Sequence, residues 1–228
     1  MSGRMNLQNN DLELIRTGLP FWKYLSESEK NLIKDKITKN EIIRGTQLIT
    51  GSSECSGLFL VKSGRIRAFI VSEEGREITL YRLRSNDVCI MSASCLMRDL
   101  NFTIYLEVEE SGILYILPAG IYEAISSRNI DVKEFTVSVI SEKFSQVMNT
   151  IDRVFFAGIP RRIAYFLLEQ KEMNSTNILK FTHDDIAKNI GSVREVVSRT
   201  LKDFENKGII KLSRGKLEIL NSKQLENY

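Results

Sequence analysis

The 228-residue chain is long enough for one large or two modest domains, each with its own hydrophobic core. Hydrophobic residues at 43% and charged residues at 27% are ordinary for a globular protein, and three prolines argue against long disordered linkers. The N-terminus lacks a continuous apolar stretch, and nowhere do about 18 apolar residues follow one another. These features argue against a signal peptide and a membrane partner, and they predict a cytoplasmic protein.

The net charge of +3 is unevenly divided along the chain. From Gly158 onward thirteen Lys and Arg stand against nine Asp and Glu, a net +4. Residues 1–157 hold the other nineteen basic and twenty acidic residues, a net −1. A basic module beside a near-neutral one is typical of a phosphate-binding domain attached to a second domain.

Short helices are predicted first, over residues 11–40, where Leu and Ile recur at helical spacing and Ser26 with Glu29 matches a capping box. Over residues 41–118 the pattern changes to short β-rich runs separated by Gly, Ser, Asn and Asp. Many short strands at this spacing predict an antiparallel barrel or jelly roll.

Two hairpin turns are predicted within this β-rich region, because turn-forming residues interrupt alternating apolar runs. One lies at Ser63-Gly64 and the other at Glu73-Glu74-Gly75.

A longer helix follows, in which apolar residues recur at alternating spacings of three and four, the seam of a coiled coil. The residues of this seam are Val137, Ile140, Phe144, Val147, Ile151 and Val154. One interpretation is a helix that packs only along its own barrel. The other is a helix that also pairs with a second copy in a homodimer, for which Met148 and Phe155 widen the stripe.

Two helices that meet at a glycine are predicted between Thr182 and Gly208. Thr182 with Asp185 caps the first helix, Gly191 lies in the turn, and Ser192 is expected to cap the second helix. This order of elements is the helix-turn-helix signature. After Gly208 the run "IIKLSRGKLEIL" predicts a hairpin with a basic tip, the wing of a winged helix.

The second helix of this motif separates into two faces. One arc of about 140° is polar and could read DNA. The other arc is expected to dock on a core, and it holds Val193, Val196, Val197, Thr200, Leu201 and Phe204. Arg can bind guanine through two contacts, Glu can accept from cytosine, and Lys suits phosphate. The predicted DNA-binding residues are Thr182, Ser192, Arg194, Glu195, Ser198, Arg199, Lys202 and, in the wing, Arg214. A competing role for Glu195 is a capping box with Ser192.

This arrangement resembles the Crp/Fnr family of bacterial transcription regulators over nearly the whole chain. The run from Arg44 to Leu83 has glycines at the family's turn positions, and "SVREVVSRTL" is similar to its DNA-reading segment. The resemblance implies an α+β protein with an N-terminal antiparallel β-roll and flanking helices, a long dimerisation helix and a C-terminal winged helix-turn-helix domain. The implied domains are a sensing domain at 1–129, the dimerisation helix at 130–157 and the DNA-binding domain at 158–228. By the same resemblance, Arg194, Glu195 and Arg199 match base-reading residues of the family.

The sequence also lacks the ligand-binding residues of two branches of that family, the cyclic-AMP binders and the Fnr-type iron-sulfur proteins. The region from Asn86 to Val108 lacks the Gly-Glu and Arg-Ser pairs of the cyclic-AMP binders. No cysteine precedes Cys55, as an Fnr-type iron-sulfur cluster would require, and the one histidine, His183, lies in the DNA-binding motif rather than in the roll. We therefore expect no metal and no cofactor.

An unidentified small-molecule effector is expected in the β-roll instead. Its predicted pocket is lined by Cys89, Met91, Ser92, Ala93, Ser94, Thr103 and Tyr105. These small and soft side chains suit an apolar or aromatic ligand with a few hydroxyl contacts. The alternatives are a filled roll in a ligand-independent regulator, and a redox pair of Cys89 with Cys95.

The function predicted from these residues is a homodimeric regulator that binds a palindromic site in double-stranded DNA. RNA polymerase becomes a further partner if the protein activates transcription. A cupin-like enzyme is the distant alternative, but cupin metal sites need histidines and this barrel has none, so no catalytic activity is predicted.

Overall fold

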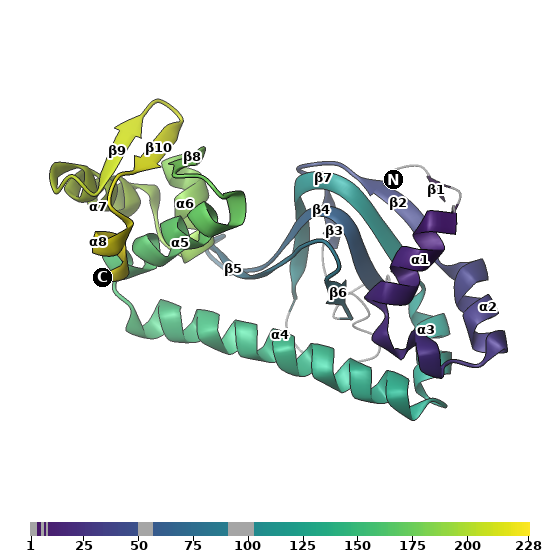
Figure 1. Ribbon diagram of the computed structural model, residues 1–228. Helices are drawn as coiled ribbons and strands as arrows, with labels where there is room; N and C mark the ends of the chain where they lie inside the picture. The colour runs from purple at the N-terminus through teal and green to yellow at the C-terminus, as the bar shows by residue number, and fades with distance from the viewer. Residues whose placement is uncertain (1–3, 6, 8, 50–56, 91–102) are drawn as a thin grey trace. The chain divides into compact units, whose positions relative to one another are not determined.

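The computed structural model describes residues 4–5, 7, 9–49, 57–90 and 103–228. The chain divides into two compact units (Figure 1). The first comprises residues 1–69 and 80–147, and the second comprises residues 70–79 and 148–228. No helix in the described part of the chain combines the length and the apolar character that a membrane span requires.

The first unit combines helices with an antiparallel sheet, as the sequence predicts. Its helical elements are α1 (Asn9–Gly18), the 3-10 helix η1 (Pro20–Tyr24), α2 (Glu27–Lys36), α3 (Ala119–Ser126) and most of α4 (Ile130–Phe156). Its strands are β1 (Arg4–Met5), β2 (Thr38–Ile42), β3 (Gln47–Ile49), β4 (Leu58–Val71), β5 (Glu77–Leu83), β6 (Val88–Cys89) and β7 (Tyr105–Leu117), with the tips of β4 and β5 counted in the second unit. The predicted capping box is confirmed, since Ser26 and Glu29 exchange side-chain and backbone hydrogen bonds at the start of α2.

The long strands β4 and β7 form the centre of the sheet, whose order is β1-β2-β7-β4-β5, with β3 on β7 and β6 on β4. The predicted turn at Glu73-Glu74-Gly75 is confirmed, because the chain reverses there between β4 and β5. The hairpin predicted at Ser63-Gly64 is wrong. Both residues lie inside β4, where the register with β7 shifts, and Gly64 adopts a φ of +90°.

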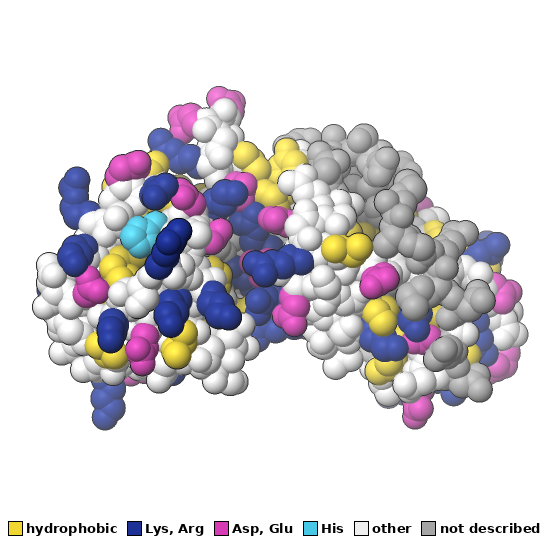
Figure 2. All heavy atoms as spheres, turned by 90° about the horizontal axis from the view of Figure 1, so that it is seen from above, with side chains coloured by type: hydrophobic (Ala, Val, Ile, Leu, Met, Phe, Trp, Pro, Cys, Tyr) yellow, Lys and Arg dark blue, Asp and Glu magenta, His cyan; other side chains and the backbone are white. Residues whose placement is uncertain are grey.

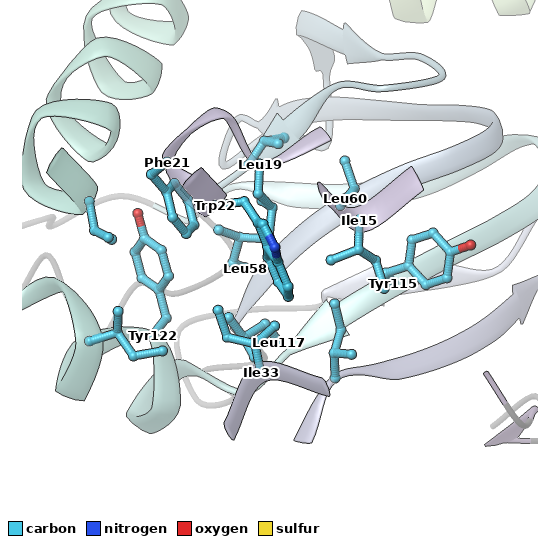
Figure 3. Close-up of a cluster of buried hydrophobic side chains, with 14 of the residues drawn as sticks. Ile15, Leu19, Phe21, Trp22, Ile33, Leu58, Leu60, Tyr115, Leu117 and Tyr122 are labelled. Carbon is cyan, nitrogen blue, oxygen red and sulfur yellow. The ribbon is translucent and has the colours of Figure 1, made fainter. Parts of the chain in front are cut away.

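One hydrophobic core joins the helices of the first unit to its sheet (Figure 3). Ile15 of α1, Trp22 of η1 and Ile33 of α2 meet side chains of β4 and β7 such as Leu58 and Leu117. All of these side chains are buried, which is the main stabilising contribution that an apolar side chain makes.

A buried ionic cluster ties α1 to three strands of the same unit. Asp11 of α1 accepts hydrogen bonds from Lys39 of β2 at 2.9 Å, Lys62 of β4 at 2.8 Å and the Tyr115 hydroxyl of β7 at 2.6 Å. Burial, together with the hydrogen bond to Asp11, raises the pKa of Tyr115. The four side chains come from four separate segments, so this cluster fixes where α1 lies on the sheet.

The second unit has the elements of a winged helix. They are α5 (Ile159–Asn174), β8 (Ile178–Leu179), α6 (His183–Ile190), α7 (Arg194–Asn206), β9 (Ile210–Ser213), β10 (Lys216–Ile219) and α8 (Ser222–Glu226). The strands form a small antiparallel sheet in the order β8-β10-β9, and the β9–β10 hairpin is the predicted wing. The helices and strands share one buried core. Pro160 lies in the first turn of α5, where its missing N–H leaves no helix hydrogen bond unmade.

Candidate nucleic-acid interface

The first helix of the motif, α6, is fixed at both ends. Thr182 and Asp185 form the predicted capping box at its start, with the Asp185 amide donating to the Thr182 hydroxyl at 3.1 Å. At its end Gly191 takes a left-handed conformation with φ of +65°. Arg162 of α5 donates to the Ile190 carbonyl at 2.9 Å, a contact that places a positive charge at the negative end of the helix dipole.

The start of the second helix, α7, differs from the prediction. Its N-cap is Val193 rather than Ser192, and no side chain caps the first turn. The Ser192 amide instead donates to the Ala187 carbonyl within the turn. Glu195 therefore has no capping role in the structure, and its carboxylate is exposed.

The inner face of α7 is narrower than the sequence suggests. Val197, Leu201 and Phe204 are fully buried in the core of the unit. Val193 and Val196, which are predicted to dock on that core, are 42% and 36% exposed. The prediction is wrong for these two residues. Val197, Leu201 and Phe204, which follow one another at spacings of four and three, already occupy the face of α7 that packs on the core.

The outer face of α7 borders a hollow of about 670 Å³. Its lining residues are Arg194, Glu195, Ser198, Arg199, Lys202, Asp203 and Asn206. Within the described residues, neither Arg199 nor Glu195 has an intramolecular ion pair or side-chain hydrogen bond. Both side chains therefore remain available to an external partner that offers complementary donors and acceptors.

The two other cations of the hollow are held by weak surface pairs. Arg194 lies 3.3 Å from Asp184 of α6, and Lys202 lies 2.7 Å from Glu205 one turn along α7. Exposed pairs of this kind contribute little to stability, so an incoming phosphate or base can replace either carboxylate. Figure 2 shows Lys and Arg side chains spread over the face of this unit that carries the single histidine.

Lys207, just past the end of α7, is more firmly engaged. Its ammonium lies 2.7 Å from Asp203 and donates to the Tyr228 hydroxyl at 3.0 Å. These two hydrogen bonds raise the pKa of Lys207 to about 12, so it is a permanent cation at this end of the helix. Arg214, at the tip of the wing, is exposed between β9 and β10.

The tip of β5, which belongs to the same unit, holds the turn between α6 and α7, a contact that sequence patterns do not indicate. Thr79 donates to the Asn189 side chain at 2.9 Å, and Ile78 forms a β-bridge with Ile190. A Cβ atom placed on Gly191 would lie 2.7 Å from the Ile78 side chain. The spacing of residues in the sequence carries no signal for contacts between such distant segments.

Replacing Gly191 with alanine is expected to destabilise the second unit more than replacing Gly208 does. Both glycines have positive φ, so each alanine costs about 1 kcal/mol in backbone strain. Only the alanine at position 191 must also displace Ile78, which adds about 1 kcal/mol or more, since open space surrounds Gly208. Thermal unfolding followed by circular dichroism measures the stability of both variants. Equal losses of stability would show that the Ile78 side chain moves aside at no cost.

A stripe of apolar side chains runs along α4. Three residues of the predicted seam, Val137, Phe144 and Ile151, are exposed, and the other three, Ile140, Val147 and Val154, are half-buried. Met148 and Phe155 extend the exposed stripe, and Phe155 is 78% exposed. The stripe from Val137 to Phe155 is about 27 Å long at 1.5 Å per residue.

The residues predicted for the effector pocket are only partly described. Met91, Ser92, Ala93, Ser94 and the redox candidate Cys95 lie outside the described residues. Cys89 is buried and faces Phe59 of β4 in the sheet, whereas Tyr105 faces Phe69, ten positions further along the same strand, and stacks on its ring. The structure therefore does not bring Cys89 and Tyr105 together. Thr103 is half-buried.

Potential metal ligands do not gather anywhere in the described ranges: no group of three or more His, Cys, Asp or Glu side chains there could hold an ion.

Comparison with known proteins first identifies the second unit. Residues 161–228 match the family model of the Crp-like helix-turn-helix domain. This segment contains α6, α7 and the wing, so the match covers the elements that form the hollow.

Similarity to whole proteins extends over both units. A crystal structure of a transcriptional regulator of the Crp/Fnr family from Eubacterium rectale is 43% identical, covers 93% of this chain and 98% of its own, and superposes with a TM-score of 0.90. The cyclic AMP receptor protein of Thermus thermophilus is 23% identical, over 92% of this chain and 96% of its own length. The fumarate and nitrate reduction regulatory protein of Vibrio cholerae is 22% identical, over 98% and 91%.

Proposed function

The chain belongs to the Crp/Fnr family of transcription regulators, and from that premise we propose that it binds a palindromic DNA site as a homodimer, under the control of a small effector. In this proposal residues 1–129 sense the effector, residues 130–157 dimerise and residues 158–228 bind DNA. The protein acts in the cytoplasm, and RNA polymerase is its partner if it activates transcription.

The observation that carries the DNA-binding proposal is the hollow along α7. Arg199 and Glu195 line it without intramolecular partners among the described residues, and they offer the donor fork and the acceptor that distinguish a G·C pair in the major groove. Arg194 and Ser198 border the same hollow. Thr182, Ser192, Lys202 and Arg214 are proposed to position the motif through phosphate contacts.

The proposal of a homodimer is supported by the exposed stripe of α4. The exposed face of α4 forms a continuous apolar patch, with Val137, Phe144, Ile151 and Phe155 in water. On an ordinary protein surface exposed apolar residues are scattered singly. Spacings of seven, seven and four residues are those of a coiled-coil seam. Two-fold pairing of this face would give two copies of α7, as a palindrome with half-sites one helical turn apart requires.

A Phe144→Glu variant is expected to weaken the dimer at least tenfold, since two charges would enter the apolar seam, at a cost of about 1.4 kcal/mol or more. Analytical ultracentrifugation over a range of protein concentrations measures the dissociation constant. Ile43→Glu is the matched control, because Ile43 is similarly exposed but lies after β2. If both variants dimerise as the parent protein does, α4 is not the interface.

The DNA-binding proposal is tested by selecting bound fragments from random duplex DNA with the purified protein at near-physiological salt. Recovery of a palindrome with a G·C-containing half-site supports it and shows that the protein binds without added effector. Binding without a consensus and with a steep dependence on salt would mean that only phosphates are contacted. Absence of binding at low salt would contradict the proposal.

The effector is proposed to act on the DNA-binding unit through its different affinities for two arrangements of the protein, because a ligand shifts an equilibrium only by that difference. A ligand-independent regulator is the alternative. It would select the same palindrome at the same affinity whatever small molecule is present.

A further inference from the structure

The inner face of α4 changes its character along the first unit. Near its start this face is apolar, with Val132 and Val139 buried in the core. One turn further along, the buried residue is Lys143, which is 2% exposed. Lysine is among the residues least often buried, because removing its charge from water costs several kcal/mol unless a partner compensates.

The partners of Lys143 compensate poorly. Its ammonium lies 3.1 Å from Glu142, the next residue on the helix, whose side chain is 60% exposed and so remains in water. Among the described residues, its ammonium also lies over the ring of Tyr81 on β5, 5.5 Å from the ring centroid. Burial is the main cause, and the neighbouring Cys89 thiol a smaller one, that raises the pKa of Tyr81 well above its ordinary value. Tyr81 therefore stays neutral and supplies no counter-charge.

Gln146 adds a second incomplete group on the same side of α4. Its Nε2 donates to Glu142 Oε1 at 2.9 Å, while its own Oε1 is buried without a hydrogen-bond partner among the described residues. The reverse orientation of the amide would place Oε1 against the Glu142 carboxylate oxygen and is disfavoured. A buried acceptor without a partner costs about 1 to 3 kcal/mol.

Two donors thus converge on one oxygen. Lys143 Nζ and Gln146 Nε2 both donate to Glu142 Oε1. The exposed Glu142 side chain folds back along the helix to accept both hydrogen bonds. In effect, Glu142 supplies an oxyanion from the chain itself. Such a contact is readily displaced, because an exposed carboxylate gains as much from water as from the pair.

We propose that the effector of the sensing domain is held from α4, where Lys143 and Gln146 form its recognition site beside Tyr81 of the sheet, and that this effector is a small organic oxyanion with an O–H or N–H donor. The oxyanion of the effector takes the place of the Glu142 carboxylate beside the Lys143 ammonium. The O–H or N–H group of the effector donates a hydrogen bond to Gln146 Oε1, and its organic part contacts the ring of Tyr81. The inference rests on the proposed function, since it names the chemical class of the effector that controls DNA binding. Carboxylates and phosphate monoesters share this chemistry.

The test uses the full-length protein and three probes, each compared with sodium chloride at equal ionic strength. The probes are 4-hydroxybenzoate for the carboxylate, glycerol 3-phosphate for the phosphate and 4-hydroxybenzamide as the neutral analogue. At ten times its dissociation constant, an oxyanion probe is expected to raise the Tm by about 3 °C. The neutral analogue should leave the Tm unchanged. The oxyanion that produces the larger shift identifies the class, and no shift from either would overturn the proposal.

Variants separate this site from unspecific salt binding. Lys143→Met should abolish the shift, while Glu142→Ala should produce it at about a tenth of the probe concentration, because the competing carboxylate is gone. A purely structural ion pair would instead make Glu142→Ala less stable without tighter binding. Lys133→Met and Glu134→Ala are the matched controls on exposed positions of the same helix and should respond as the parent does. A shift that persists in Lys143→Met would contradict the assignment.

Selection of DNA sites with the same variants keeps this inference apart from the proposed function. If the Lys143→Met protein still selects the palindrome of the parent but no longer responds to the probe, it has lost effector recognition and kept DNA binding. A parent protein that recovers no palindrome under any condition refutes the proposed function, whatever the probes do.

Discussion

An Asp11→Ala variant is expected to lose about 3 to 5 kcal/mol of the free energy of unfolding of the first unit, because breaking a buried ion pair leaves an uncompensated charge. Asp11 is 1% exposed, and it is the partner of Lys39, which is almost as deeply buried. Without the carboxylate, the Lys39 ammonium would remain in the interior with no counter-charge, and the Tyr115 hydroxyl would lose its acceptor.

Urea unfolding followed by fluorescence measures this loss. The chain has a single tryptophan, Trp22, which is buried in the core of the first unit and reports on that unit alone. Asp35→Ala is the control, since Asp35 is exposed and should change stability by about 0.5 kcal/mol or less. A loss below about 1 kcal/mol for Asp11→Ala would mean that water reaches Lys39.

A double variant tests the mechanism of the loss. Adding Lys39→Met to Asp11→Ala removes the unpaired ammonium and supplies an apolar side chain of similar length. We expect it to recover part of the lost free energy, as replacement of buried ion pairs by apolar residues commonly does. No recovery would indicate that the hydrogen bonds of Lys62 and Tyr115, rather than the Lys39 charge, carry the stabilisation.

Several features set by neighbouring residues were predictable from the sequence, although the cap expected at Ser192 is not formed. Both capping boxes, at Ser26 and Thr182, depend on a side chain and a backbone amide three residues apart, and both are confirmed. The long helix α4 follows from its apolar period, and the order of strands and helices matches the resemblance to the family.

Features set by distant residues could not be predicted in this way. Gly64 carries the signal of a turn, but the approach of β7 makes it a bulge in a continuous strand: a Cβ on Gly112 would lie 2.1 Å from the Ser63 carbonyl oxygen. Lys143 has the sequence context of a solvent-facing helix residue and is nevertheless buried. In both cases a segment remote in the sequence decides the environment of the residue.

The residues proposed to bind DNA fall between these extremes. The helical period correctly places Arg194, Glu195 and Arg199 on one outer face, because that depends on α7 alone. It cannot tell which of them are already paired. The ion pair of Arg194 with Asp184 involves the neighbouring helix, and it leaves Arg199 as the arginine of the hollow without a partner among the described residues.

Replacing Arg199 with alanine is expected to remove about 1 to 3 kcal/mol of specific binding for each half-site, and so about 2 to 6 kcal/mol for a symmetric dimer on a palindrome. The loss should be confined to the cognate sequence and should relax the choice of base at one position of each half-site. Since Arg199 has no intramolecular partner in the described structure, its removal should leave the melting temperature unchanged. Fluorescence anisotropy with the selected palindrome and with random duplex measures both affinities.

Lys202→Ala is the matched control on the same face of α7. Its ammonium already pairs with Glu205 and is proposed to contact phosphate, so its loss should weaken binding to all sequences alike and flatten the salt dependence by about one unit per half-site. The two variants therefore differ in kind. If Arg199→Ala weakens the palindrome and random duplex equally, Arg199 is a phosphate contact, and the reading of G·C pairs must be assigned to Arg194, which would first have to leave Asp184.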